Sequence, residues 1–487
     1  MIARYSWLLL ALAGAASAQE AEFRWKGEVY SDLRFETSEK VPFERSESGA
    51  SAEFIGEYGG HLLGKAAFEV IYTERGTANT FDELSSRQAI DPFRFESDAL
   101  FVTFTDAGLD GLDISLGRKV VIWGTADRFH PTANTNALDV EDPLAFGEYI
   151  PTEMLDIRYS PYFTFGDEDD PWFEEFSIQA ILVPFFKPAQ LPGSARKAFT
   201  DVDEQIRLAT TDKLKNLSRI QKGWLATPGV TNTYDIHVDK PEYDMTNAQV
   251  GVRMGWNFFG WDMSVSYFRG FDDFPRAEQA TVTGSTDDIF TELHLTFPRV
   301  QVIGFDVATS LDWLDGVGLW AEVATTFHDE LYVTIDGRNF KDNIFDEQTP
   351  YGSLFEGGPA LEHGKGNFVK ATVGMDYTPA PWLYMNVQYL RGFVDEFGTA
   401  NLHDYLVAGM DFKMASDTVT LRLFGIVNFE DTSWVLFPQI IARPFNGAEI
   451  SVGAFLFGSQ FYGDTETKFG SPVAGASTVF AKVRALF

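Results

Sequence analysis

The chain has 487 residues, with 38 Lys and Arg against 71 Asp and Glu, and its formal net charge is −33. A negative charge of this size excludes nucleic acid as a partner on electrostatic grounds. The absence of cysteine excludes a disulfide framework and a cysteine-linked lipid anchor. The length alone would suggest about three soluble domains. However, one strand-like pattern repeats from residue 23 to residue 487, and it favours a single large β architecture over residues 19–487.

The first part of the chain, residues 1–18, is predicted to be a cleaved export signal. Arg4 precedes an apolar core at residues 7–16, and Ala16, Ser17 and Ala18 supply the small side chains of a cleavage site. This core is too short to cross a bilayer as a helix. No later segment offers about 18 consecutive apolar residues. The chain is therefore either a secreted soluble β protein or a transmembrane β-barrel, whose alternating strands escape hydropathy analysis.

From the amino terminus onward, apolar and polar residues alternate with the period of two that is typical of strands. At residues 23–35, for example, Phe23, Trp25 and Val29 oppose Arg24 and Lys26. The alternating runs are about 10 to 14 residues long, which exceeds a usual soluble strand and matches a tilted strand that spans a bilayer. We therefore favour the membrane barrel over a soluble sandwich or propeller. Further runs of this kind are at 248–256, 261–267, 369–377, 383–389 and 419–423.

Short and long connections alternate along the chain, as in barrels with short periplasmic turns and long outer loops. This alternation requires a tight turn at Gly59 and Gly60, and one strand at 288–310 that bends at Pro298. The count is then 18 strands, or 16 if residues 52–73 form a single strand. The predicted long connections are 75–92, 123–152, 187–243, 272–287, 329–366, 394–401 and 458–472.

The connection at 123–152 follows a strand at 112–116 and shows no periodicity. It is rich in Asn, Thr, Asp and Pro, yet it holds Trp123, Phe129 and Phe146, which a linker rarely does. We expect it to leave the extracellular side of the wall and to fold inward as the constriction of the barrel. Its charged residues are the single base Arg128 and the acids Asp127, Asp139, Glu141, Asp142 and Glu148.

The connection at 187–243 contains helical sequence. Asp201 and Glu204 have the spacing of a capping pair. The apolar residues that recur at helical intervals are Ile206, Leu214, Leu217 and Ile220. A short helix is predicted here, either as a plug inside the barrel or as a cover over its rim.

The last strand has Val479, Ala481, Val483, Ala485 and Phe487 on one face. A terminal aromatic residue on such a strand resembles the assembly signal of Gram-negative outer-membrane proteins. We assign that role to Phe487.

The segment 94–143 resembles a group of porin-like Gram-negative outer-membrane barrels of largely unknown function, which are similar in architecture to alginate-export-type barrels. Their pattern runs from a strand ending in G-R-Q through W-G and an acidic residue to D…N-P-x-D. Lys119 stands in place of the Gln, and Asp142-Pro143 in place of Asn-Pro. The resemblance implies an outer-membrane channel or transporter without a defined solute. The matching residues are Gly117, Arg118, Trp123, Gly124, Asp127 and Asp139.

Opposed acidic and basic walls in a lumen orient polar solutes. On this basis we assign one set of lumen and constriction residues, although the loop acids could instead only hold the loop in shape. The histidine and acid spacings match neither zinc nor calcium motifs, so no metal and no cofactor is predicted. The set is Arg118, Lys119, Trp123, Gly124, Asp127, Arg128, Asp139, Glu141, Asp142, Arg158 and Arg253.

The predicted function is passive diffusion of small polar solutes across the outer membrane, with a cation preference that follows from the overall acidity. The alternatives are a substrate-specific transporter of hydrophobic or polymeric ligands, and a structural barrel that docks a partner protein through 187–243 and 329–366. An enzyme is not expected, because no G-x-S-x-G element occurs and no spacing favours His294 as the partner of Ser264 or Ser266. Expected partners are membrane lipid, lipopolysaccharide and the barrel assembly machinery.

Overall fold

A computed structural model describes residues 21–37, 42–73, 76–167, 170–209, 212–284, 288–336, 358–459, 467–471 and 473–487. The predicted export signal at 1–18 lies outside these residues. No helix in this part of the chain has the length and apolar character needed to span a bilayer.

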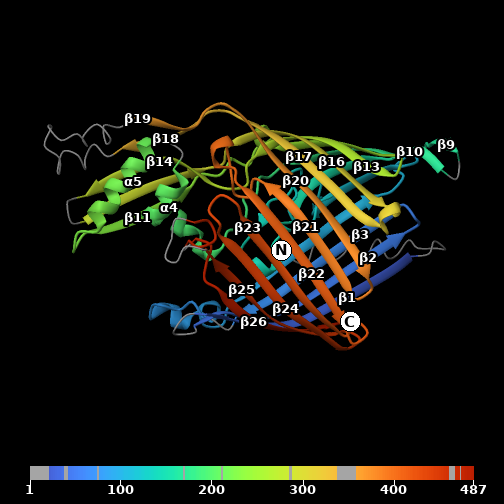
Figure 1. Cartoon of the computed structure of the whole chain (residues 1–487), viewed down its shortest axis with the longest axis horizontal. Coiled ribbons are helices and arrows are strands. Elements are labelled where there is room, and N and C mark those ends of the chain that lie inside the picture. The colour runs from blue at the N-terminus through green and yellow to red at the C-terminus, as the bar shows by residue number, and fades with distance from the viewer. Residues whose placement is uncertain are drawn as a thin grey trace.

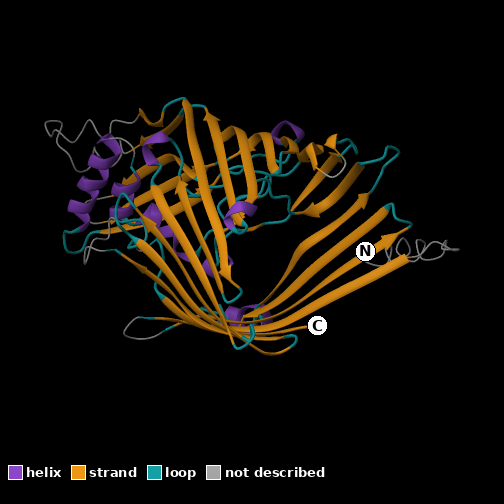
Figure 2. Ribbon diagram, turned by 45° about the vertical axis from the view of Figure 1, so that its right-hand side comes forward, coloured by secondary structure: helices purple, strands orange, loops and turns teal. Residues whose placement is uncertain are grey.

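Antiparallel strands pair edge to edge into a closed barrel of 18 strands, as the sequence predicts. The ring closes where β1 (Ala21–Glu36) pairs with the last strand, β26 (Thr478–Leu486). Figures 1 and 2 show these strands tilted around a common axis. The other wall strands are β2 (Phe43–Tyr58), β3 (Leu62–Thr73), β4 (Phe93–Phe104), β5 (Leu112–Lys119), β8 (Thr152–Tyr159), β10 (Asp170–Val183), β12 (Gln249–Phe258), β13 (Trp261–Phe271), β16 (Arg299–Leu311), β17 (Val317–His328), β20 (Gly366–Ala380), β21 (Leu383–Arg391), β22 (Asp404–Met414), β23 (Val419–Asn428), β24 (Trp434–Phe445) and β25 (Ala448–Gly458). The short β9 (Phe165–Asp167) pairs with the start of β10.

The tight turn between β2 and β3 decides the strand count. Gly59 and Gly60 have φ of 63° and 71°, a region that glycine adopts without steric cost. On either side of them Tyr58 pairs with Leu62. Residues 52–73 are therefore two strands, and the alternative of 16 strands is wrong.

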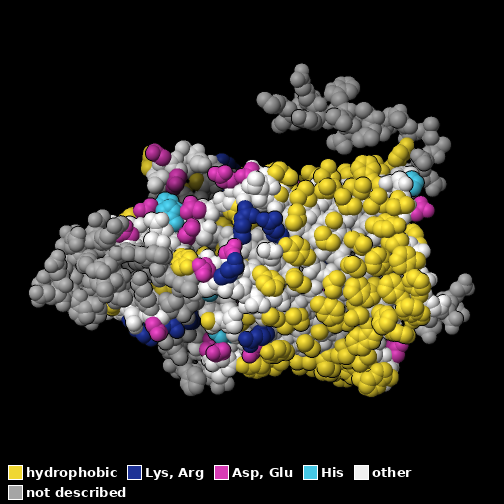
Figure 3. Space-filling view, turned by 90° about the horizontal axis from the view of Figure 1, so that it is seen from above, with side chains coloured by type: hydrophobic (Ala, Val, Ile, Leu, Met, Phe, Trp, Pro, Cys, Tyr) yellow, Lys and Arg dark blue, Asp and Glu magenta, His cyan; other side chains and the backbone are white. Residues whose placement is uncertain are grey.

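Alternation along each strand divides the wall into two faces. Outward positions carry large exposed apolar side chains such as Trp25, Ile303 and Val373, and Figure 3 shows them as a broad hydrophobic band. Inward positions are buried and polar, for example Asp306 and Glu322. A closed barrel with an apolar outer band and a polar interior has the two surfaces that a membrane-spanning barrel requires.

A second sheet stands beyond the long-connection end of the barrel, and the sequence analysis did not foresee it. Three long connections contribute its five strands, which do not join the wall. We call this sheet, together with the three helices below, the cap (Figure 1). Its strands, in spatial order, are β11 (Thr231–Val238), β15 (Asp288–Thr296), β14 (Arg276–Gly284), β18 (Leu331–Asp336) and β19 (Gly358–His363).

The cap corrects one predicted strand. Residues 288–310 were expected to form a single bent strand, but β15 ends at Thr296 and belongs to the cap, whereas β16 begins at Arg299 and belongs to the wall. Proline lacks the amide that a continuous ladder would need. Pro298 therefore ends one strand and separates it from the next rather than bending one strand.

Helices in the 187–243 connection cover the cap sheet. They are α3 (Lys197–Thr200), α4 (Val202–Leu208) and α5 (Asp212–Leu225). Asp201 caps α4 by accepting from the amides of Asp203 and Glu204, as the capping pair predicts. The Tyr234 hydroxyl on β11 accepts from Gln205 and Gln221. These bonds hold α4 and α5 on the cap.

Candidate functional site

The segment between β5 and β8 forms a closed loop that a buried asparagine ties at its neck. Asn136 accepts from the amide of Val121 at 2.8 Å, and its side-chain amide donates to the carbonyls of Lys119 and Ile150. These contacts join the outgoing and returning arms, because Lys119 ends β5 and Ile150 lies two residues before the start of β8. We call residues 120–151 the inner loop. Its shape near the wall is therefore set by its own residues.

Glu322 on β17 fixes the first part of the inner loop inside the barrel. One carboxylate oxygen accepts from the amides of Thr125 and Ala126, each at 2.7 Å, and contacts His130 Nδ1 at 3.1 Å. The other oxygen accepts from the Thr132 hydroxyl at 2.9 Å. The Glu322 side chain is fully buried. Burying a carboxylate costs several kcal/mol of folding free energy unless its oxygens are hydrogen-bonded. The inner loop supplies these hydrogen bonds to Glu322, and Glu322 in turn holds the loop.

The tip of the inner loop reaches the opposite side of the ring. Asp127 accepts from the Asn386 side chain on β21 at 3.0 Å. Arg128 places its guanidinium 5.7 Å from the ring centre of Phe424 on β23. Phe129 is buried in an apolar cluster with Leu390, Tyr405, Val407, Ile426, Val435 and Phe469 of this side.

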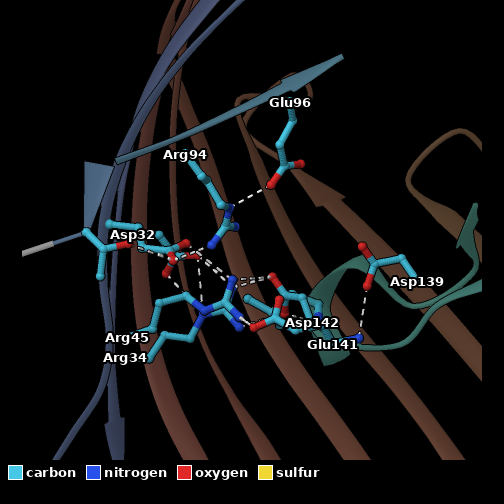
Figure 4. A network of polar contacts seen from close by, with 11 residues as sticks. Asp32, Arg34, Arg45, Arg94, Glu96, Asp139, Glu141 and Asp142 are labelled. Carbon is cyan, nitrogen blue, oxygen red and sulfur yellow. Dashed lines mark hydrogen bonds and ion pairs between the residues drawn. The ribbon is translucent and has the colours of Figure 1, made fainter. Parts of the chain in front are cut away.

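The returning arm pairs with two arginines of the amino-terminal strands (Figure 4). Arg34 on β1 donates to both carboxylate oxygens of Asp142, at 2.6 and 2.7 Å. Arg45 on β2 contacts Asp142 at 3.5 Å and also binds Glu141. Burial alone would raise the pKa of Asp142, but hydrogen bonds and charge from Arg34, with the charge of Arg45, hold this pKa below its usual range. The loop therefore spans the interior from β17 to β1.

Trp123 and Gly124 lie at the base of the loop and serve its packing. The Trp123 indole donates to Gln179 on β10 at 2.9 Å, and its side chain is buried. Gly124 lies against Glu322 and has a φ of 108°. A side chain at this position would be strained and would occupy the space of the carboxylate.

Arg118 does not face the lumen, so its assignment as a lumen residue is wrong. It pairs in register with Leu100 and Glu153, and it has the same parity as the exposed Leu116. Its guanidinium contacts Glu153, which also binds Lys187. This polar group lies on the outer face, near the end of the wall where the long connections leave. A one-residue step in register moves a side chain to the other face, and for this reason the neighbouring Lys119 faces inward.

The remaining predicted bases face the interior. Lys119 binds Asp156 on β8 at 2.7 Å. Arg253 on β12 donates to Ser264 and to Asp306. Arg158 pairs in register with Gln179, on the inward face near the short-turn end of β8.

Acidic side chains gather on one sector of the inner wall. The carboxylates of Glu69, Glu96 and Asp98, on β3 and β4, lie within 4.8 Å of one another. The inner loop adds Asp139 and Glu148 on the short strands β6 (Leu138–Asp139) and β7 (Glu148–Tyr149). Burial, with the charges of Asp142 and Asp139, raises the pKa of Glu148 to about 7.

An apolar cavity of about 490 Å³ lies between the inner loop, the upper barrel wall and the cap. This volume lies in the range of sites for small organic ligands. We call the cavity the vestibule. Its aromatic lining consists of Phe146, Phe199, Tyr234, Phe274, Phe393, Phe424, Phe437, Phe455, Phe457 and Phe469.

Most basic side chains that line the vestibule have an acidic partner, either in the lining or next to it. Lys468 binds Asp395 and Glu396, Arg207 binds Glu204, and Arg276 binds Asp272. Arg128 differs, because within the described residues its guanidinium has a contact with the Phe424 ring but none with a carboxylate. Arg128 is also exposed, and its backbone φ of 65° lies in the left-handed region.

Ser264 and His294 do not form a catalytic pair. Ser264 lies on the inner wall and binds Asp306 and Arg253. His294 lies on the cap and binds Asp239 at 2.8 Å. The pairing of Ser264 with His294 that the hydrolase alternative invoked is therefore absent from the described residues.

Phe487 lies at the end of the chain, next to the first wall strand. Its amide and carbonyl pair with Gly27 on β1, and its ring contacts Trp25 edge-on. The side chain remains exposed on the outer face. Its role as an assembly signal stays a prediction.

No family model and no curated protein matches the chain, so the resemblance of segment 94–143 stays a prediction. Solved structures match over almost the whole length. Acinetobacter baumannii OccAB1 is 7% identical, with 96% of each chain covered and a TM-score of 0.47. Salmonella typhi OmpF in complex with daunomycin is 11% identical, and a mutant of the Rh. blastica porin is 10% identical. Each match covers 96% of this chain and 100% of that one, with TM-scores of 0.39 and 0.38. TM-scores below 0.5 carry no argument about this chain, and the evidence for the barrel is the pairing of its own strands.

Sequence reasoning missed the wall residues that hold the inner loop, namely Glu322, Arg34 and Arg45. Each occupies a polar position of an alternating strand, a signal that predicts an inward side chain but not its partner. Asn136 was also missed, since nothing in an Asn-rich loop marks which asparagine is buried.

Proposed function

We propose that the protein is an outer-membrane channel that admits a small amphipathic molecule, with an apolar body and one anionic group, through the vestibule. The observation that carries the proposal is the Phe-rich lining of this cavity beside the guanidinium of Arg128, which contacts no carboxylate among the residues that the structure describes. It favours the selective transporter over general diffusion of polar solutes. The closed barrel with its apolar outer band supports the location.

The lining explains why an apolar body would enter. Transfer of apolar surface from water to such a cavity gains roughly 25 cal/mol per Å². A polar solute of similar size loses hydrogen bonds to water and finds few partners on phenylalanine rings. Arg128 then supplies a fixed donor group for a carboxylate or sulfonate.

Single-channel recording tests this proposal with membrane-impermeant solutes. An aryl sulfonate added on the vestibule side should interrupt the current in resolved events, whereas methanesulfonate and a neutral sugar should not. Arg128→Gln and Phe146→Ser should each shorten these events. Lys413→Gln is the matched control, because Lys413 lies on the inner face of β22, near the short-turn end. Equal blockade by the sugar, or events unchanged in Arg128→Gln, would overturn the proposal.

A second candidate is the cation preference expected from the overall acidity. The carboxylates of Glu69, Glu96, Asp98, Asp139 and Glu148 on one sector of the interior favour it. In a salt gradient, the reversal potential would then have the sign of a cation-selective pore. A reversal potential of the opposite sign excludes this candidate and leaves the vestibule proposal standing.

A further inference from the structure

Two histidines from distant parts of the chain meet on the solvent face of the cap. β11 and β15 run parallel, and His237 lies directly opposite His294 in their register. Glu292 lies on the same face of β15, two residues before His294. The other face of β15 carries Leu293, which lines the vestibule. The group formed by His237, Glu292 and His294 is therefore partly exposed, on the side of the sheet away from the cavity.

Both imidazoles direct the same nitrogen toward one carboxylate. The Nε2 atoms of His237 and His294 lie 3.6 and 3.5 Å from Oε1 of Glu292. One donor atom from each of the three residues lies within 4.8 Å of the other two. The rings are 5.0 Å apart and nearly parallel, with an interplanar angle of 26°.

These separations fit ligands around one small cation. Zinc binds nitrogen and oxygen at about 2.0 to 2.2 Å in tetrahedral geometry, so two of its ligands lie about 3.4 Å apart. The two distances to Glu292 are close to this value. A mixed set of imidazole and carboxylate suits zinc and its first-row neighbours, whereas calcium and magnesium prefer an all-oxygen set.

A fourth residue orients one ligand. Asp239, just beyond β11, lies 2.8 Å from Nδ1 of His294. A proton on this Nδ1 leaves Nε2 with a free lone pair that faces Glu292. A carboxylate behind a metal-binding imidazole is a recurrent arrangement that fixes the tautomer and raises the basicity of the ligand.

We propose that His237, Glu292 and His294 bind one divalent transition metal of the zinc class, with Asp239 as the residue that positions His294. Three protein ligands leave one coordination position for water or for a ligand from outside. The metal joins β11, at the edge of the cap sheet, to β15. It thereby stabilises the cap on the face opposite the vestibule.

Metal titration of the full chain in detergent, after treatment with a chelator, tests the proposal. Calorimetry should give one zinc per chain, and cobalt in its place should give the visible absorption of a tetrahedral site. His294→Gln and Glu292→Gln should abolish the tight site. Asp239→Asn should keep one site per chain but weaken it by about 10- to 100-fold.

Two histidine variants serve as controls. His61 lies in a short turn. His363 lies on the cap beside His328 of the wall strand β17, with ring centres 6.3 Å apart. His61→Gln and His363→Gln should bind zinc like the wild type. Unfolded variants are recognised by losing the compact electrophoretic mobility of an intact barrel. Absence of a one-to-one site in the wild type, or equal binding by folded His294→Gln, would show that these residues form only an ion pair and would overturn the proposal.

Discussion

Gly124 of the inner loop lies directly against the carboxylate of Glu322 on the wall. A Cβ atom placed on Gly124 would lie 2.3 Å from Oε1 of Glu322. The same oxygen accepts the amides of Thr125 and Ala126, the next two residues of the loop. Residues 124–126 therefore contact the wall through one atom, Oε1 of Glu322.

Gly124→Ala is expected to detach this part of the inner loop from β17. The substitution is unfavourable twice, because φ at this residue is 108° and because the methyl group would overlap the carboxylate. Single-channel conductance should become larger and noisier. Gly193→Ala is the control, since a Cβ there meets no atom within 4 Å. An unchanged conductance in Gly124→Ala would show that the contact does not hold the loop.

Glu322→Ala should destabilise the loop and also remove the part of the effect of Gly124→Ala that comes from overlap with the carboxylate, whereas the backbone strain at residue 124 remains. Hydrogen bonds to a charged group contribute about 1.5 to 3 kcal/mol each, and Glu322 makes several. A double-mutant cycle on urea unfolding measures the coupling. We expect the cost of Gly124→Ala to fall when the carboxylate is absent. Additive costs would contradict direct contact between these two residues.

The attachment of the inner loop to β1 should resist mild acid. The pKa of Asp142 is lowered in the folded protein, so its contribution is complete above the unfolded value of about 3.9 and is lost as the pH falls through the lower folded value. Asp142→Asn should lose about 1.5 to 3 kcal/mol at neutral pH, because Arg34 loses a charged hydrogen-bond acceptor but keeps Asp32 as a partner at 2.7 Å. Urea unfolding recorded against pH tests both statements. A loss of stability near neutral pH that occurs in the wild type and is absent in Asp142→Asn would contradict them.

Ion selectivity should change around neutral pH through Glu148. Its pKa of about 7 means that the side chain is uncharged below this value and negative above it. Cation preference should therefore increase as the pH rises through about 7, and Glu148→Gln should remove this step. Reversal potentials on either side of neutrality provide the measurement. A step of equal size in Glu148→Gln would assign it to another group.

Arg118 and Arg45 give a paired test of the two faces of the wall. Arg118 lies on the outer face and Arg45 on the inner face, where it contacts Asp142 and Glu141. Arg118→Gln should leave conductance and selectivity unchanged, and Arg45→Gln should alter both. A change of selectivity in Arg118→Gln would contradict the outer-face position and indicate that Arg118 faces the lumen.

The barrel could be predicted because strand period and turn chemistry are local. Met263, Val265 and Tyr267 alternate with polar residues, and Gly59-Gly60 marks a turn without knowledge of any partner. The assignment of Arg118 to the lumen was wrong for a related reason. The alternation of residues 112–116 continues through Gly117, whose φ is 131°, and it places Arg118 on the same outer face as Leu116. A slip of one residue is enough to exchange the faces.

The cap and the candidate metal site could not be predicted, since they depend on pairing between distant segments. His237 and His294 are neighbours only because β11 and β15 run parallel. A spacing search along the sequence cannot detect this arrangement. The same limit applies to Glu322, whose partners in the inner loop are almost 200 positions away in the chain.

The cap sheet has a consequence for the order of assembly. Its strands come from the connections between β10 and β12, between β13 and β16, and between β17 and β20. These connections leave the same side of the wall, and the sheet can close only after the wall strands beneath them have become neighbours. Contacts of such long sequence separation form late, because loop closure costs entropy before pairing returns it. A folded cap therefore indicates that the wall strands from β10 to β20 have become neighbours in the correct order.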